Sequence, residues 1–470
     1  MKTDTIAAIA TALSDSGIGI IRVSGEEAIP IVHKIYRNKK NEEVLSGYES
    51  HTIHYGFIVE KSGNLIDEVM VSVMKAPHSY TTEDTVEINC HGGVLMMKKI
   101  LMTVIEAGAR LAEPGEFTKR AFLNGRIDLS RAEAVMDMIH AKNQFALKSS
   151  VKQLRGSVFK KVKELREKIL YEIAFIESAL DDPEHISLDG YRKKLEQKTL
   201  SVKLDLKKLI DSADNGKLLK DGINTVIVGK PNVGKSSFLN LLVGEERAIV
   251  TSVAGTTRDT LEEFVKLNGI GLNIIDTAGI RDTDDEVEKI GVEKARRYAS
   301  NADLIIYMTD VSQKLDENDA EIVELIADKK IIVLLNKTDL EQVVSDDEIY
   351  EFMNKKMTQV SENNSLRVIK TSTKEHIGID AFEDAIKEMF FGGEIAVNDE
   401  IYITSRRHKE ALLEAYESMD FVLRSLADDM PEDFYSIDLM NAYASLGRII
   451  GEEVGDDLVN EIFRKFCMGK

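Results

Sequence analysis

The sequence predicts a multidomain protein of combined α/β and α+β class, in which an α/β domain interrupts a helical domain. Three observations support this prediction. Residues 1–124 mix short alternating apolar runs with turns, residues 217–384 alternate apolar strands with helical segments, and residues 125–216 and 385–470 both have a helical periodicity. Because the ends of a domain often lie close together, the α/β domain is predicted to be inserted between two parts of one helical domain.

The composition limits the class of protein. A chain of 470 residues with 43% hydrophobic residues suits two to four packed domains. The formal net charge of −20 does not favour a free-standing nucleic-acid binder, although a local basic patch or a basic partner could supply those contacts. With only Cys90 and Cys467, no signal peptide and no run of 18 apolar residues, we expect a cytoplasmic protein without a membrane span.

The first 124 residues are predicted to form a compact α+β module. Four short segments combine β-branched residues with alternating polarity, and one segment, 96–109, has a helical period that ends at Gly108. The predicted strands are 18–25, 51–59, 69–77 and 84–93.

The second zone is predicted to be helical. Apolar residues recur at spacings of mostly three and four from Leu147 to Leu180, which predicts one long amphipathic helix that ends at Asp181–Pro183. A second helical run leads to Asn215-Gly216, and the last zone, 385–470, is helical again.

The zone 217–384 is predicted to contain a parallel sheet. Two of its apolar segments are apolar on both faces, as buried parallel strands are. The predicted strands are 223–229, 272–279, 303–310, 330–339 and 366–372.

A phosphate-binding motif follows the first of these strands. Gly229–Ser236 reads GKPNVGKS, which fits GxxxxGK[ST], and a helical run comes directly after it. The glycines let backbone N–H groups approach phosphate oxygens, Lys235 reaches the β- and γ-phosphates, and the Ser236 hydroxyl binds Mg²⁺. The alternative is a chance glycine turn, which the strand–loop–helix context disfavours.

Three further motifs stand at successive strand ends. The Asp276–Gly279 segment (DTAG) can hold the metal and contact the γ-phosphate. In Asn336–Asp339 (NKTD) a carboxylate can accept two N–H groups of guanine, and Ser372–Lys374 (STK) can present backbone donors to the guanine carbonyl. The four motifs in this order resemble the GTPase superfamily, which implies a Ras-like P-loop domain that binds GTP.

The usual water-positioning glutamine is replaced by Ile280, which cannot form a hydrogen bond. Thr257 is the predicted second Mg²⁺ ligand. A carboxylate in the acidic segment 281–288 could position water, although simple solvation is the alternative for each of its members. Arg258 and Arg281 are candidate charge stabilisers or surface residues.

Several motifs together resemble the MnmE (TrmE) family of bacterial tRNA wobble-uridine modification GTPases. These are the inserted GTPase domain, AGTTRD at 254–259, DEVEKIGVEKA at 285–295 and the terminal FCMGK. The segments IIRVSG, HGG and 113–134 match the folate-binding-like N-terminal domain of this family. The resemblance therefore spans essentially the whole chain. It implies a domain order of an N-terminal tetrahydrofolate-binding and dimerisation domain (1–124), a helical domain in two parts (125–216 and 385–470, with a terminal CxGK motif) and a GTPase domain (217–384).

The resemblance implies a K⁺-activated GTPase whose GTPase domains pair face to face. By this resemblance, Asn232 coordinates K⁺ together with Thr251, Val253 and Thr256. The ion then supplies the positive charge that an arginine finger gives in other GTPases. Glu288 orients the attacking water, and Lys235 acts with it in catalysis. The alternative for Asn232 is a turn residue after Pro231. The predicted GTP-binding residues are Asn232, Val233, Gly234, Lys235, Ser236, Ser237, Thr251, Ser252, Val253, Ala254, Gly255, Thr256, Thr257, Asp276, Thr277, Ala278, Gly279, Asn336, Lys337, Asp339, Ser372, Thr373 and Lys374.

The resemblance also implies a site for a 5-formyl- or 5,10-methylene-tetrahydrofolate. Arg22, Glu87, Arg126 and Lys470 match its binding positions; a carboxylate can accept paired N–H groups of a pterin edge, and cations can meet the glutamate tail. Cys467 is implied in the modification reaction. On the residues alone, Arg126 is a surface residue at a helix start and Cys467 a packed core residue.

The function implied is a homodimeric GTPase that forms a heterotetramer with the flavoprotein MnmG. The pair would add an aminomethyl or carboxymethylaminomethyl group to C5 of the wobble uridine of certain tRNAs, with tRNA held largely through the complex. One alternative is a ribosome-assembly GTPase, although no basic RNA-binding module is evident in the sequence. The other is a switch protein with slow hydrolysis and no folate site.

Overall fold

The computed structural model describes residues 4–244, 263–267, 269–275, 302–326, 329–356, 366–391, 401–452, 454–464, 466–467 and 469. They form two compact units, each assembled from segments that are distant in the sequence. The first comprises Met1–Met136, Gln153–Lys203 and Glu414–Lys470, and the second comprises Asp137–Lys152 and Leu204–Leu413. Within these described ranges, no helix is both long enough and apolar enough to cross a membrane.

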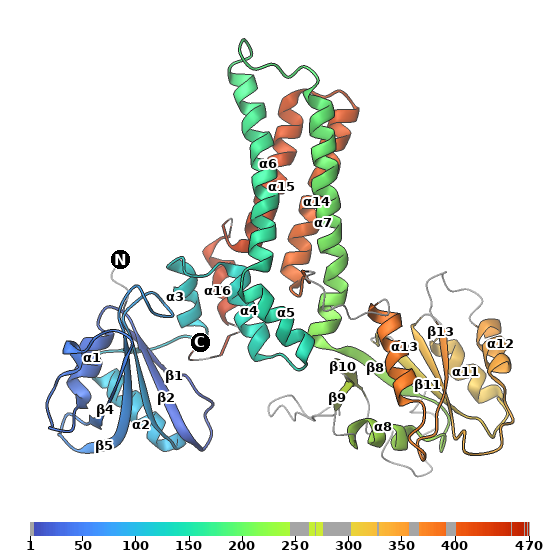
Figure 1. Cartoon of the computed structure of the whole chain (residues 1–470), viewed down its shortest axis with the longest axis horizontal. Coiled ribbons are helices and arrows are strands. Elements are labelled where there is room, and N and C mark those ends of the chain that lie inside the picture. The colour runs from blue at the N-terminus through green and yellow to red at the C-terminus, as the bar shows by residue number, and fades with distance from the viewer. Residues whose placement is uncertain are drawn as a thin grey trace. The chain divides into compact units, whose positions relative to one another are not determined.

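The N-terminal part of the first unit is a seven-stranded sheet in the order β3-β4-β5-β6-β2-β1-β7. Figure 1 shows this sheet with β1, β2, β4 and β5 labelled. Neighbouring strands are antiparallel, except that β1 and β7 are parallel. Alternate apolar residues of the strands share one core with helices α1 (Ala28–Ile35) and α2 (Val94–Glu106). The strands are β1 (Ile6–Ile9), β2 (Ser16–Ser24), β3 (Tyr36–Arg37), β4 (Thr52–Val59), β5 (Leu65–Met74), β6 (Thr85–Gly92) and β7 (Arg110–Leu111).

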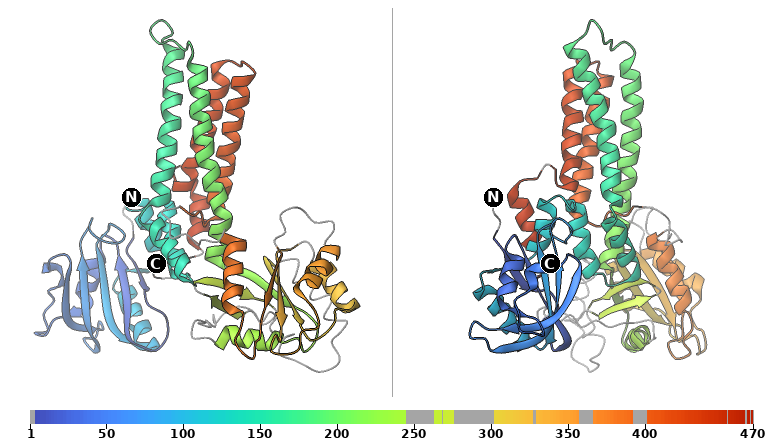
Figure 2. Two further views of the ribbon diagram at one scale, coloured as in Figure 1. Left: turned by 45° about the vertical axis from the view of Figure 1, so that its right-hand side comes forward. Right: turned by 60° about the vertical axis from the view of Figure 1, so that its left-hand side comes forward.

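Four long helices, α6, α7, α14 and α15, run side by side and form a bundle (Figure 2). The hydroxyl of Tyr191 on α7 donates to Glu172 on α6 at 2.7 Å, and Lys203 on α7 forms an ion pair with Asp420 on α14. The helices outside the two sheet domains are α3 (Glu116–Leu123), α4 (Leu129–Ile139), α5 (Gln144–Leu154), α6 (Ser157–Asp181), α7 (Tyr191–Asp221), α14 (Arg406–Ala427), α15 (Glu432–Ile450) and α16 (Asp456–Arg464).

The second unit contains a six-stranded sheet in the order β13-β12-β11-β8-β10-β9. Its strands are parallel except for the β9–β10 hairpin. Alternate strand residues face α8 and α13 on one side and α11 and α12 on the other, so both faces of the sheet are covered. The elements are β8 (Ile223–Val228), α8 (Lys235–Gly244), β9 (Glu263–Leu267), β10 (Ile270–Ile274), β11 (Leu304–Asp310), α11 (Glu317–Ile326), β12 (Ile331–Asn336), α12 (Asp346–Lys356), β13 (Leu366–Lys370) and α13 (Ile379–Phe391).

Each predicted strand overlaps an observed strand, and the parallel arrangement is confirmed. The last four residues of the predicted strand 272–279 lie outside the described residues. Two helix predictions are wrong. The single helix from Leu147 to Leu180 is two helices, α5 and α6, separated by Gly156 in a left-handed conformation. The helix α7 does not end at Asn215-Gly216 but continues to Asp221. A Cβ at Gly216 would lie 2.2 Å from the carbonyl oxygen of Ile403, so this glycine permits a close backbone approach instead of ending the helix.

Candidate functional site

The phosphate-binding loop connects the end of β8 to the start of α8, as the motif predicted. The Lys235 ammonium turns back into this loop, where it donates to the carbonyl oxygens of Gly229 and Lys230, each at 2.7 Å. Burial lowers the pKa of Lys235 to about 8. The loop therefore already holds a partly buried cation that phosphate oxygens would stabilise.

The backbone of the loop is fixed by two residues in left-handed conformations. Asn232 has φ +63°, and asparagine tolerates this region better than most residues. Gly234 has φ +106°, and a Cβ there would lie 2.2 Å from the Asn336 side-chain nitrogen. Only glycine leaves the space that this backbone needs.

Asn336, at the end of β12, joins the phosphate loop to the predicted guanine loop. Its Nδ2 donates to the Val233 carbonyl oxygen at 2.8 Å, and its Oδ1 accepts the Thr373 backbone N–H at 3.1 Å. The side chain is fully buried. Two motifs about 100 residues apart are thus brought together by one amide, as their places at successive strand ends predicted.

The carboxylate predicted to read guanine is held by the neighbouring loop. Asp339 accepts a hydrogen bond from the Ser372 hydroxyl at 2.8 Å, and the Lys374 ammonium lies 3.9 Å away. Lys337 instead pairs with buried Asp310 at 2.7 Å. A cavity of about 470 Å³ adjoins these loops and is lined by Ser237, Asn240, Leu241, Gly244, Thr373 and His376.

The remaining predicted residues of this site cannot be placed. They lie outside the described residues, as do Ile280, the acidic segment 281–288 with the proposed water-orienting Glu288, and Lys470 of the folate set. The predicted GTP- and metal-site residues that lie outside the described residues are Thr251, Ser252, Val253, Ala254, Gly255, Thr256, Thr257, Asp276, Thr277, Ala278 and Gly279.

A second cluster gathers three of the residues predicted to bind folate. Arg22 on β2 and Glu87 on β6 are cross-strand partners, and Nε and Nη2 of Arg22 each lie 2.8 Å from Glu87 Oε1. Arg126 approaches the same place from the loop after α3, where its Nη1 donates to the Tyr80 carbonyl oxygen at 2.8 Å. Two paired strands and a loop thus bring these side chains together.

Two aromatic rings that sequence reasoning missed lie under these cations. The guanidinium carbons of Arg126 and Arg22 are 4.9 Å and 5.7 Å from the centre of the Tyr80 ring. That of Arg22 is also 5.6 Å from the ring of Phe117, which is fully buried on α3. A lone aromatic residue in a loop or a short helix carries no local pattern that distinguishes it from a core residue.

The C-terminal tail reaches the same cluster. The Gly115 N–H donates to the Cys467 carbonyl oxygen at 3.3 Å, and Arg22 Nη1 donates to the Gly469 carbonyl oxygen at 3.3 Å. Phe466 is buried, whereas Cys467 is exposed, so the interpretation of Cys467 as a packed core residue is wrong. The alternative role in modification remains a prediction.

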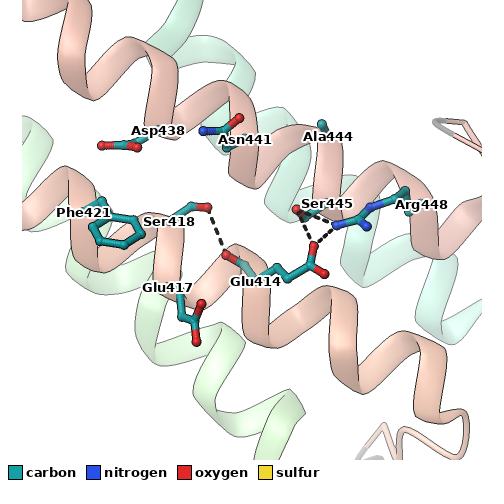
Figure 3. Close-up of a pocket in the computed structure, with 9 residues that line it drawn as sticks. All are labelled: Glu414, Glu417, Ser418, Phe421, Asp438, Asn441, Ala444, Ser445 and Arg448. Atoms are coloured by element: carbon teal, nitrogen blue, oxygen red, sulfur yellow. Dashed lines mark hydrogen bonds and ion pairs between the residues drawn. The ribbon is translucent and has the colours of Figure 1, made fainter.

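A further cavity, of about 570 Å³, lies between α14 and α15 and contains none of the predicted residues (Figure 3). Arg448 forms an ion pair with Glu414 there, and Ser445 donates to the same carboxylate at 3.3 Å. Partial burial raises the pKa of Asp438. These contacts connect α14 to α15 within the bundle.

The doubly covered parallel sheet, the phosphate loop and the loop that carries Asp339 define a P-loop domain of the Ras-like, guanine-specific class. Comparisons with known proteins give a narrower assignment, and they concern the whole chain. Residues 5–126 match the model of the GTP-binding protein TrmE N-terminus, and residues 129–467 match that of the MnmE helical domain. The chain therefore belongs to the MnmE (TrmE) family.

Curated relatives agree over the full length. A "tRNA modification GTPase MnmE" from Lachnoclostridium phytofermentans is 57% identical, with 100% of both chains covered. One of the same name from Clostridioides difficile is 50% identical, with 99% of each chain covered. Among solved structures, the G domain of the T. maritima FeoB iron transporter covers 36% of this chain and 98% of its own at 24% identity and a TM-score of 0.26. The family assignment rests on the two family models and on the full-length relatives.

Proposed function

We propose that this protein is a K⁺-activated, homodimeric GTPase of tRNA modification. With the flavoprotein MnmG, and with a tetrahydrofolate one-carbon donor, it adds an aminomethyl or carboxymethylaminomethyl group to C5 of the wobble uridine of certain tRNAs. The observation that carries the proposal is the presence of two distinct sites in one chain. One is the nucleotide site joined by Asn336, and the other is the cluster of Arg22, Glu87 and the tail.

The nucleotide site fits the groups that the proposal requires. The left-handed backbone conformations of Asn232 and Gly234 give the loop the curvature of a phosphate cradle, and the tight space at Gly234 excludes a side chain there. Ser236 with Thr257 would hold Mg²⁺, and Asn232 with the loop residues 251–256 would hold K⁺. These cations supply positive charge to the phosphates, while Asp339 selects guanine and Lys235 binds phosphate oxygens.

The N-terminal cluster fits a tetrahydrofolate derivative. Both contacts of Glu87 with Arg22 fall on Oε1, so Oε2 is the oxygen that would accept N–H groups from the pterin edge. The exposed Arg126 would meet the glutamate carboxylates of the ligand. The exposed Cys467 on the adjoining tail is the proposed thiol of the modification centre.

The experiment that tests the proposal is nucleoside mass spectrometry of bulk tRNA from a strain that lacks this protein. We expect 5-substituted wobble uridines to disappear and to be restored by the wild type but not by K235A or C467S. The matched controls are K387A, which removes a lysine on α13 that pairs with Glu383, and C90A, which removes a buried thiol; both should restore the nucleosides.

Two outcomes would contradict the proposal. An unchanged nucleoside profile in the deletion strain would favour the ribosome-assembly GTPase, and ribosome profiles would then be measured. The role given to Asn232 fails separately if the purified wild type hydrolyses GTP equally fast in K⁺ and in Na⁺ at equal ionic strength.

A further inference from the structure

Tyr80 is held at three points in the middle of the N-terminal cluster. Its ring lies beneath the guanidinium groups of Arg126 and Arg22, at 4.9 Å and 5.7 Å, and packs against buried Phe117 and its neighbours. Its carbonyl oxygen accepts from Arg126, and its hydroxyl is 2.9 Å from the buried Thr118 hydroxyl on α3. The ring is therefore fixed at its hydroxyl end by α3 and presents its face to two cations.

We propose that Tyr80 is a positioning residue that holds Arg22 and Arg126 in place for a ligand with a pterin edge and glutamate carboxylates. This inference rests on the folate site proposed above. A guanidinium that lies over an aromatic face is attracted through that face, which leaves the N–H groups in its plane available for oxygen atoms. One ring can thus orient two cations without competing with the ligand for their donors.

The two arginines have different tasks in this arrangement. The donors of Arg22 bind Glu87 Oε1 and the Gly469 carbonyl oxygen, so its position fixes the direction of the carboxylate and of the tail. Arg126 is exposed and donates Nη1 to the Tyr80 carbonyl oxygen, so its other N–H groups are the ones that would meet the ligand carboxylates. Tyr80 therefore acts on both ends of the ligand through two separate groups.

The test is equilibrium binding of 5-formyl-tetrahydrofolate to the full-length protein and its variants. Y80L removes the ring and should weaken binding about tenfold to a hundredfold, since two cation–π contacts are lost. Y80F keeps the ring and loses only the hydroxyl, so it should bind within about threefold of the wild type. The control Y171L also removes a tyrosine under a cation, because Lys198 lies 4.8 Å above that ring in the helix bundle, and it should not change binding.

A double-mutant cycle separates positioning from simple packing. If the ring acts through Arg126, Y80L should weaken binding several-fold less in an R126A background than in the wild type. Equal losses in the two backgrounds would show that the ring does not act through Arg126 and would overturn the inference that it positions both arginines. Y80Q, which keeps a polar side chain of moderate size, replaces Y80L if thermal unfolding shows that Y80L does not fold.

The failures of the two proposals are distinguishable. If the wild type binds the folate and Y80L binds it equally well, the inference on Tyr80 is wrong and the folate site stands. If the wild type does not bind the folate at all, the proposed folate site is wrong, and the inference falls with it.

Discussion

The two sites of this chain are built in opposite ways. The nucleotide site uses backbone groups of consecutive residues, which the carboxyl ends of parallel strands bring together around Asn336. The N-terminal cluster uses side chains from separate segments, namely Arg22, Tyr80, Glu87, Arg126 and the tail. The difference predicts that the first site is sensitive to backbone geometry, and the second to single side chains and to the placement of the tail.

The largest effect is expected where a side chain is forced into the phosphate loop. In G234A the new Cβ would lie 2.2 Å from the Asn336 nitrogen, at a φ of +106° that alanine rarely adopts. We expect nucleotide affinity to fall on the order of 100-fold, because the loop must leave the conformation that cradles phosphate. Fluorescent GDP binding measures this loss, and folate binding to the same variant should be unchanged.

The matched control is Gly244, the last residue of α8, which begins directly after Gly234. Gly244, at the end of α8, has open space where a Cβ would stand. G244A should therefore keep the GDP affinity of the wild type. Nucleotide binding by G234A at wild-type strength would contradict the account of the loop as a backbone site.

An intermediate effect is expected at the tail. Gly469 has φ +86°, and a Cβ there would lie 2.3 Å from the Ile9 carbonyl oxygen, so G469A should displace the tail from Arg22. Loss of one charge-assisted hydrogen bond predicts folate binding about tenfold weaker, with GTP hydrolysis unchanged. Calorimetric folate titration measures the first quantity and phosphate release the second.

Gly63 provides the control for this prediction. It also has φ +86°, but nothing lies near the position of its Cβ. G63A therefore carries the same backbone strain without displacing a neighbour and should keep the folate affinity. Equal losses in G63A and G469A would show that strain in the domain, and not the tail, controls binding.

The same contrast explains what the sequence could and could not predict. The phosphate loop is a contiguous motif between a strand and a helix, so the positions of Lys235 and Asp339 followed from local patterns and strand order. Arg22, Glu87 and Arg126 were predicted only through a family resemblance, because their proximity depends on strand register and on a loop after α3. Tyr80 and Phe117 had no local signal at all.

The helix boundaries show a second limit. The apolar period continues through Gly156, so the pattern alone could not separate α5 from α6. At Gly216 the pattern predicted a helix end that does not exist. Glycine commonly ends helices, but this one lies inside α7, where the absence of a side chain lets the Ile403 backbone approach. At Gly156 the left-handed backbone, and at Gly216 a long-range backbone contact, decide what the glycine does, and neither can be deduced from the apolar pattern.

The smallest effect concerns the charge of the nucleotide site. Burial lowers the pKa of Lys235 to about 8 in the nucleotide-free protein, and bound phosphates raise it again. The charged lysine binds phosphate better, so affinity must fall as the pH rises through the pKa of the free protein. If the pKa of Lys235 in the GDP-bound protein lies well above 8.5, we expect GDP affinity to fall about fourfold between pH 7 and pH 8.5. Calorimetry in buffers of different ionisation enthalpy should show uptake of about half a proton at pH 8.

The variant K235R tests the origin of this pH dependence. Arginine keeps its charge over the whole range, so the variant should bind GDP more weakly but without the slope and without proton uptake near pH 8. A wild-type affinity that is flat from pH 7 to pH 8.5 would show that Lys235 is already fully charged before nucleotide binds. The nucleotide site would then differ less from the N-terminal cluster than its burial indicates, because both would present a permanently charged cation to an anionic ligand.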